Sequence, residues 1–240
     1  SEIGQQLGVG TIIKGSVQNT SEKVRVHVQL SDTQSSQLLW AETYQRNLTA
    51  ENIFDIQSEL AEKITDTLQA TLSHSEKERV YEVPTKNLQA YHLYVQGRTH
   101  LNQRTKSSIR RSLEYFNQAV DHDESYALAW AGLAEALILS AFYGFPPSSG
   151  KNPSAIEAGS RALQLDPDLA EGHASMGIIH AVEQDIPAAV RELELAIELQ
   201  PSYAEALNWL GWVLMLKGDI AQAVIPAEHA KELDPMAPYI

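Results

Sequence analysis

The residues best suited to chemistry in this chain are a pair of histidines. His173 and His180 are seven residues apart, a spacing that places both on one face of a helix. Imidazole is a common zinc ligand, so the pair could begin a metal site. The chain offers neither a third ligand at helical spacing nor a His-Glu-x-x-His motif. We therefore interpret both histidines as core or groove residues and expect no metal.

Three other patterns also have a plain structural interpretation. The acidic run at 121–124, Asp-His-Asp-Glu, could attract a cation, but it ends an expected helix and fits a solvated turn. Gly8-Val9-Gly10 lacks the third glycine and the basic residue of a phosphate-binding loop. The absence of cysteine excludes disulfides, thiolate zinc sites and cysteine nucleophiles. No catalytic constellation remains, so we expect this chain to be non-catalytic and to hold no cofactor.

Charge and hydropathy exclude further classes. The net charge is −13, which argues against a nucleic-acid surface. Residues 127–240 carry fifteen Asp/Glu against five Lys/Arg, whereas a short basic cluster lies between Arg98 and Arg111. No apolar run approaches the roughly 18 residues of a membrane span. The chain lacks a starting Met and a signal peptide, so we expect a piece of a longer protein.

A fixed period dominates the rest of the sequence. Pro167, Pro201 and Pro235 are 34 residues apart. Other positions repeat at the same step: Leu165, Leu199 and Leu233; Ala162, Ala196 and Ala230; Gly177 and Gly211; Asp185 and Asp219. A period of this length indicates stacked helical units, because one unit cannot bury its own apolar face. Such stacks make binding surfaces.

This pattern resembles the tetratricopeptide repeat, in which two antiparallel helices form each unit. The resemblance implies four repeats, A to D, at 90–126, 127–169, 170–203 and 204–237. Repeat A has about three extra residues, expected near Arg104, and Glu124 in place of the proline. Repeat B is nine residues too long, with the excess around 142–150. The resulting expectation is a mainly α protein with eight helices between about Leu88 and Leu233, stacked as a right-handed superhelix.

The amino-terminal quarter follows a different period. Residues 24–30 alternate apolar and polar, as in a strand with one wet face. Further strands are expected at 11–17 and 38–44, giving an antiparallel meander. Apolar residues from Ile53 to Leu72 then recur at helical spacing and predict an amphipathic helix that covers the sheet. Residues 3–7 are expected to end another helix.

These elements carry a second resemblance. Lys14-Gly15-Ser16-Val17, Leu39-Trp40-Ala41-Glu42 and Ile53-Phe54 are similar to the second half of the TolB N-terminal-like domain. In bacterial proteins that domain often precedes tetratricopeptide repeats, beside adenylate cyclases, winged-helix transcription regulators or protein kinases. The expected organisation is a small α+β domain at 1–75, a linker at 76–89 and the repeats at 90–240.

The repeat resemblance also implies a binding groove along the first helix of each unit. Carried over position by position, the groove residues are Tyr91, Tyr94, Arg98, Leu128, Ala131, Glu135, Glu171, Ala174, Ile178, Glu205, Asn208 and Trp212. Aromatic residues at both ends suit an extended peptide or a helix. Burial by packing is the structural alternative. Phe142, Tyr143 and Phe145 in the insertion form a second candidate contact, because so much apolar area is expected to fold against the repeats or a partner.

The sequence thus favours a protein- or peptide-binding sensory module of a larger bacterial signalling protein. The alternative is a sensor of a small molecule or polysaccharide. A compact pocket with convergent polar groups would favour that alternative. An enzyme fragment has no supporting residues. The sequence does not identify the partner, the effector domain or the side of the membrane. It is compatible with a homo-oligomer. No polar capping helix follows Pro235, so we expect further repeats or a covering neighbour.

Overall fold

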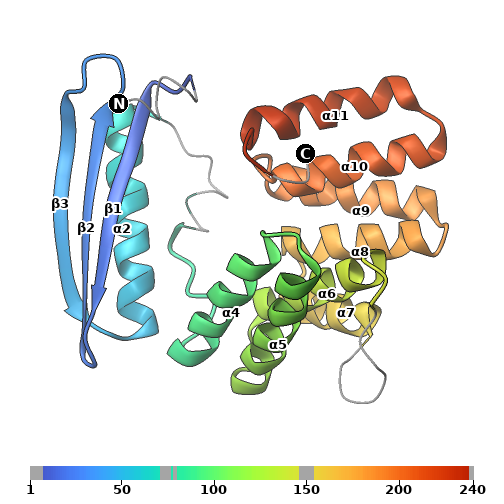
Figure 1. Cartoon of the computed structure of the whole chain (residues 1–240), viewed down its shortest axis with the longest axis horizontal. Helices are drawn as coiled ribbons and strands as arrows, with labels where there is room; N and C mark the ends of the chain where they lie inside the picture. The colour runs from blue at the N-terminus through green and yellow to red at the C-terminus, as the bar shows by residue number, and fades with distance from the viewer. Residues whose placement is uncertain (1–7, 71–76, 78–79, 146–153, 238–240) are drawn as a thin grey trace. The chain divides into compact units, whose positions relative to one another are not determined.

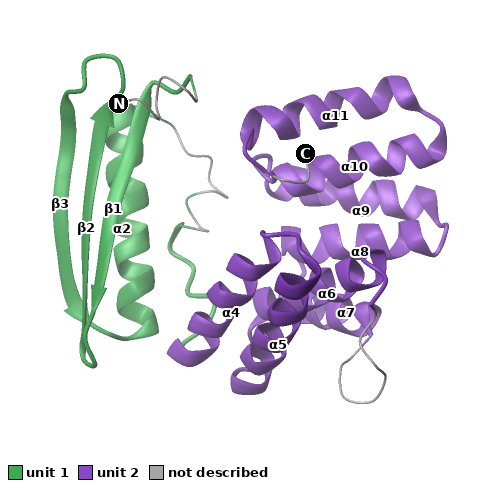
Figure 2. Cartoon of the chain, viewed as in Figure 1, with its two compact units in different colours: residues 1–86 green, residues 87–240 purple. Residues whose placement is uncertain are grey.

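The computed structural model describes residues 8–70, 77, 80–145 and 154–237. The helix expected at 3–7 and residues 146–150 of the insertion lie outside the described residues. The chain divides into two compact units, unit 1 at 1–86 and unit 2 at 87–240 (Figure 2). Each unit is described by itself.

Unit 1 is a three-stranded antiparallel meander with one long helix, as predicted (Figure 1). The strands are β1 (Thr11–Asn19), β2 (Lys23–Asp32) and β3 (Leu38–Asn47), in the order β1-β2-β3. The helix is α2 (Ala50–Leu68). Its Ile56 packs on Val24 and Tyr44, from alternate positions of β2 and β3. The sheet therefore buries one face against α2, which is what the alternation in β2 requires.

The prediction that this helix continues to Leu72 was wrong. The helix ends at Leu68, where Gln69 takes a left-handed conformation with φ of 53° and returns its N–H to Asp66 and Thr65. Such a residue closes a helix by satisfying its last carbonyls. The apolar pattern of the sequence runs on to Leu72, past the residue at which the helix ends, so the pattern alone overestimated the length of the helix.

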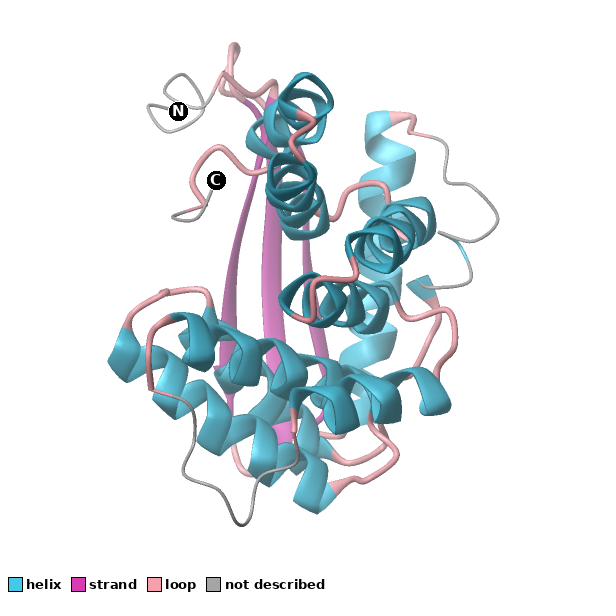
Figure 3. Cartoon of the chain, turned by 90° about the vertical axis from the view of Figure 1, so that its right-hand side faces the viewer, coloured by secondary structure: helices cyan, strands magenta, loops and turns pink. Residues whose placement is uncertain are grey.

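Unit 2 contains the eight predicted helices, and its described residues include no strand (Figure 3). They are α4 (Leu88–Leu101), α5 (Lys106–His122), α6 (Ala127–Phe142), α7 (Ala155–Leu165), α8 (Ala170–Val182), α9 (Ile186–Leu199), α10 (Ala204–Lys217) and α11 (Ile220–Leu233). Each first helix packs on the second helix of its repeat, and each second helix packs on the next first helix. The first helices α4, α6, α8 and α10 also contact one another in turn, so they form the inner layer of the stack.

A shared turn joins the helices within repeats A, C and D. Arg104, Gln184 and Gly218 all have positive φ, at 51°, 67° and 88°. Each precedes the residue that caps the second helix, and two of those caps are Asp185 and Asp219. Only repeat D uses glycine, which adopts this conformation without strain. The repeated aspartates of the sequence are thus helix caps.

The prediction that the extra residues of repeat A lie near Arg104 was wrong. Helix α5 has 17 residues, whereas α9 and α11 have 14 each. The three additional residues lengthen α5 by most of a turn and leave the turn geometry intact. An addition close to the helical period of 3.6 residues keeps the apolar face of the helix on the same side.

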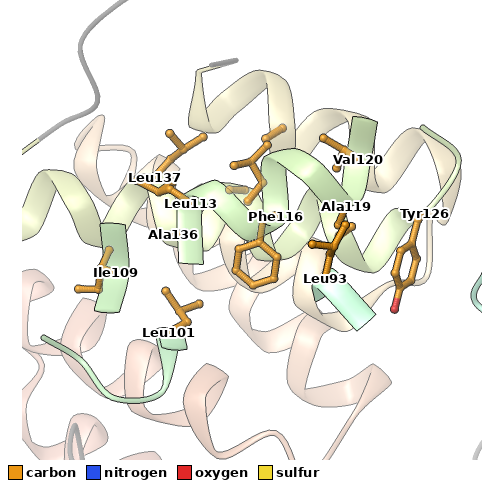
Figure 4. Close-up of a cluster of buried hydrophobic side chains, with 14 of the residues drawn as sticks. Leu93, Leu101, Ile109, Leu113, Phe116, Ala119, Val120, Tyr126, Ala136 and Leu137 are labelled. Atoms are coloured by element: carbon orange, nitrogen blue, oxygen red, sulfur yellow. The ribbon is translucent and has the colours of Figure 1, made fainter. Parts of the chain in front are cut away.

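The core of the first two repeats is centred on Phe116 of α5 (Figure 4). Its ring is fully buried and lies against Gly97 of α4 and Gly132 of α6. A Cβ built on either glycine would meet the ring at 2.6 Å. The glycines therefore make room for an aromatic ring between three helices, which offsets their conformational cost of roughly 0.5–1 kcal/mol each.

Small residues have the same purpose in repeats C and D. Ala196 is fully buried, and a Cβ on Gly211 would lie 3.2 Å from the carbonyl oxygen of Ala223. We expect Ala196→Leu to lower the free energy of unfolding by roughly 1–3 kcal/mol, because the added atoms have no free volume. Denaturant unfolding followed by circular dichroism measures the change. An unchanged midpoint would contradict this packing.

Candidate functional site

Predicted groove residues from three repeats meet at the centre of the inner layer. Arg98 of α4 lies 2.5 Å from Glu135 of α6 (Nη1 to Oε2) and 3.9 Å from Glu205 of α10 (Nη2 to Oε2). Arg104, in the turn after α4, pairs with Glu205 and lies 3.2 Å from Glu135 (Nη2 to Oε1). We call these four residues the central charge cluster. It connects the first repeat to the fourth across a sequence distance of 101 residues.

The cluster is largely withdrawn from solvent. Glu205 is 3% exposed, Glu135 is 7% exposed and the Arg104 side chain is 7% exposed. Burial, with the charge of Glu135, raises the pKa of Glu205 from 4.5 to about 7. Burial alone would raise the pKa of Glu135 too, but Arg98 and Arg104 outweigh it and hold that pKa below its ordinary value. The pKa values of the two carboxyls are thus shifted in opposite directions. As the pH falls, Glu205 is protonated before Glu135.

The other predicted groove residues in repeats A and C mostly belong to the core. The Tyr94 ring lies 6.0 Å from that of Phe116 and 5.2 Å from that of Tyr126 (centroid distances). Burial raises its pKa above the ordinary value of a tyrosine. Ile178 is 2% exposed and packs inside the core of repeats C and D. Tyr91 is half-buried. The inner layer at these repeats is therefore more closed than the position-by-position transfer implied.

Repeat D instead has an open, aromatic surface. Phe142, Trp209 and Trp212 form a cluster with ring centroids 5.7–5.9 Å apart. They border a pocket of about 470 Å³, which we call the repeat D pocket. Its lining residues are Arg104, Leu139, Phe142, Tyr143, Glu205, Asn208, Trp209, Gly211, Trp212, Met215, Ile220, Ala223, Val224 and Ala227. Asn208 and Trp212 are groove residues predicted from the sequence, and the pocket brings them together with one side of the central charge cluster.

The described aromatic residues of the insertion pack on the repeats, as expected. Phe142 stacks on Trp209 with the ring planes 19° apart and meets Trp212 edge-on. Tyr143 and Phe145 pack against the core around Phe116. The guanidinium carbon of Arg110 lies 5.7 Å from the centroid of the Phe145 ring, within cation–π range. Phe142 forms part of one wall of the repeat D pocket through its contacts with the two tryptophans.

The histidine pair is not arranged as a metal site. Nδ1 of His173 lies 2.7 Å from Oε2 of Glu192, and Nε2 lies 2.8 Å from the carbonyl oxygen of Pro167. Both ring nitrogens of His173 are therefore engaged, one by repeat C and one by the turn that precedes it. Over the described ranges, no three His, Cys, Asp or Glu side chains gather as metal ligands. Among the helices that the structure describes, none has the length and apolar character to cross a membrane.

Comparison with known proteins agrees with the helix pairs and their 34-residue step. The family model of the tetratricopeptide repeat matches residues 94–170 and 176–238. The chain belongs to the tetratricopeptide repeat family. Proteins of this family use paired antiparallel helices as interaction modules, and the inner layer described above is that of such a module.

A curated relative extends beyond the repeats. "Putative adenylate cyclase 3" of Rhizobium meliloti (strain 1021) is 26% identical over 178 residues, which cover 74% of this chain and 30% of the relative. The chain therefore spans less than a third of that protein.

Similar solved structures are also tetratricopeptide-repeat proteins. One is a thermophilic protein of Thermus thermophilus, with 19% identity, a TM-score of 0.49, and coverage of 78% of this chain and 92% of that one. Another is the first TPR of Spaghetti, determined with a bound HSP90 peptide, with 16% identity, a TM-score of 0.43, and coverage of 57% of this chain and 99% of that one.

Several residues of this site were not predicted from the sequence. Trp209 lies beside a groove position and was not among the predicted residues, although it lines the pocket. Arg104 belongs to the basic cluster noted in the sequence and was not predicted as a groove residue, yet its side chain is buried in the central charge cluster. The α11 residues of the pocket gave one signal: Ile220 and Val224 are apolar where an outer helix facing water would be polar.

Proposed function

We propose that this chain is a non-catalytic, peptide- or protein-binding sensory module of a larger bacterial signalling protein. The ligand segment lies along the inner layer and anchors an apolar side chain in the repeat D pocket. The observation that carries the proposal is that pocket, in which two tryptophans and a phenylalanine stand beside buried charges. Tryptophan and tyrosine in a recess are typical anchors of peptide recognition.

Charge supports a ligand of basic character. Residues 170–240 contain eleven Asp/Glu and three Lys/Arg, so the surface around repeats C and D is acidic. Arg98 and Arg104, at the centre of the inner layer, are already paired with carboxylates. A peptide with basic residues beside an apolar anchor would be attracted to this end of the stack, and its association would weaken as salt increases.

The signalling context rests on the relative and on unit 1. A relative named as an adenylate cyclase shares most of this chain but is much longer. Unit 1 carries the strand and helix order for which we noted similarity to the second half of a TolB N-terminal-like domain. We propose that the repeats report ligand binding to an effector domain of the adenylate cyclase or transcription-regulator type.

A second candidate function is a sensor of a small molecule. The specific observation in its favour is the volume of the repeat D pocket, about 470 Å³, which lies within the usual range for small ligands. Arg104, Glu205 and Asn208 would supply polar contacts at one end. A compact ligand would require these contacts, whereas a peptide anchor would rely on the aromatic wall.

Peptide selection tests the proposed function. A random peptide library displayed on phage is selected against the 240-residue chain, and the recovered peptides are measured on wild type and on Trp212→Ala. We expect peptides with an apolar anchor and basic neighbours, at least about tenfold weaker on Trp212→Ala and weaker at raised salt. Peptides that bind both proteins equally and ignore salt would show that the inner layer is not the site. Failure to select any peptide would favour the small-molecule alternative.

A further inference from the structure

The core of unit 2 is divided into two large apolar clusters. One surrounds Phe116 and lies in repeats A and B, and the other surrounds Leu193 and lies in repeats C and D, apart from Ile138 of α6. A smaller cluster at the boundary of repeats B and C contains Ala131, Ala162 and Leu169. Each repeat thus packs on its neighbour, which is all that a helical stack requires. A contact between repeats A and D is additional to that requirement.

The central charge cluster makes this additional contact. Nη2 of Arg104, from the turn of repeat A, pairs with Glu205 of repeat D and lies 3.2 Å from Oε1 of Glu135. The two carboxyls therefore lie side by side at one nitrogen atom, and both are nearly inaccessible to water. Adjacent carboxyls in such surroundings resist being ionised together. Repeat D is also held by the rings of Trp209 and Trp212 against Phe142 of repeat B, a contact without a titratable group.

We propose that the central charge cluster holds the stack closed between repeats A and D, and that raising the pH from about 5 to about 8 releases this contact. In the released state, repeats A and B turn away from repeats C and D at the smaller cluster. The helices stay folded, because each pair of neighbouring repeats keeps its own apolar contacts.

Release of the contact would change access to the inner layer. Arg98, Glu135 and Glu205 are three of the predicted groove residues, and in the closed state they pair within the chain. The closed cluster therefore occupies the centre of the surface on which we propose that a peptide binds. This use of the cluster rests on the proposed function, whereas the closing contact itself does not.

The surroundings of Glu205 decide the direction of the pH dependence. The charged and titratable groups that face it are Glu135 of α6, Arg98 of α4, Arg104 and Tyr203, with Glu171 of α8 and Tyr94 of α4 acting on the same groups. Burial raises the pKa of Tyr203 well above its ordinary value, so this phenol stays neutral. Burial and the charge of Glu135 together outweigh the two arginines and raise the pKa of Glu205 from 4.5 to about 7.

The sign follows from the proton that the closed state holds. In the released state the Glu205 carboxyl is solvated and regains its ordinary pKa. Between pH 4.5 and about pH 7 the closed state is protonated and the released state is not, so each step upward in pH favours release. Over this window the ratio of released to closed molecules rises by up to about 300-fold, and above it the ratio is constant.

A distance measurement between repeats A and D tests the proposal. The chain has no native cysteine, so Gln96→Cys on α4 and Lys217→Cys on α10 accept nitroxide spin labels at two exposed positions. Double electron–electron resonance gives the distance distribution at about pH 5 and about pH 8. Arg191→Cys with Lys217→Cys is the control pair, because both positions lie in repeats C and D. Far-ultraviolet circular dichroism reports whether the helices remain folded.

Two carboxyl variants identify the group that titrates. Glu205→Gln keeps the size and hydrogen bonding of the protonated side chain but cannot ionise. Glu228→Gln removes an exposed carboxyl of α11 and is the matched control.

We expect the ratio of long to short distances between repeats A and D to rise at least about tenfold from pH 5 to pH 8, with constant helix content. Glu228→Gln should behave in the same way, and Glu205→Gln should stay closed at both pH values. A distribution that ignores pH would overturn the proposal. So would a pH response that persists in Glu205→Gln, or one that also appears in the control pair or is accompanied by loss of helix. None of these outcomes bears on peptide binding, so the proposed function would stand or fall by the library selection alone.

Discussion

Replacing Phe116 with alanine is expected to lower the free energy of unfolding of the repeats by roughly 3–5 kcal/mol. The ring is fully buried and lies between Gly97 of α4 and Gly132 of α6, which have no side chains to move into the vacated space. The cavity would therefore remain, and the contacts between three helices would be lost together. Denaturant unfolding followed by far-ultraviolet circular dichroism measures the effect, because unit 2 supplies most of the helices.

Phe142→Ala is the matched control for this prediction. The same truncation at Phe142 removes a side chain that is 47% exposed and meets the rings of Trp209 and Trp212. We expect a loss of roughly 0.5–1.5 kcal/mol from its contacts with Trp209 and Trp212. Equal losses for the two variants would show that the core is not centred on Phe116.

The fold could be predicted from the sequence because the period of 34 residues fixes both the helices and their partners. Gly177 and Gly211 indicate close helix contacts from the sequence alone, since a glycine inside a helix has a conformational cost that packing must offset. The placement of the additional residues of repeat A could not be predicted in this way. Thr105 caps α5 at the position that Asp185 and Asp219 hold in repeats C and D, so the additional residues fall inside α5, and the repeat pattern does not show which helix is lengthened.

The site was less predictable than the fold because it depends on how far the stack bends. Small rotations between repeats accumulate along a helical stack. Only their sum brings Arg104 of the first repeat against Glu205 of the fourth. The repeat period determines the order of the helices but not this sum. For the same reason, Phe142 at the end of α6 could be predicted to pack, but its contact with Trp209 and Trp212 could not.

The central charge cluster leads to the second large prediction. We expect Arg104→Met to lower the free energy of unfolding by roughly 3–5 kcal/mol at about pH 8, because two buried carboxylates would then share one arginine. Glu205 and Glu135 are nearly inaccessible to water and could not be solvated in its place. Arg46→Met in unit 1 is the control, since the Arg46–Glu59 pair is 37% and 43% exposed. A surface pair of that kind contributes about 0–1 kcal/mol.

The loss in Arg104→Met should depend on pH with a defined sign. In the wild type, the pKa of Glu205 is raised from 4.5 to about 7, so over that window the folded state keeps a proton that the unfolded state has released. Raising the pH through the window therefore favours unfolding. Removing the Arg104 charge raises the pKa of Glu205 further, which steepens this dependence and extends it above pH 7. The variant should thus lose much more stability than wild type between about pH 5 and about pH 8, as measured by the denaturation midpoint at each pH. A loss that is the same at both values would mean that Arg104 acts by packing alone and that the carboxyls of the cluster do not titrate in this range.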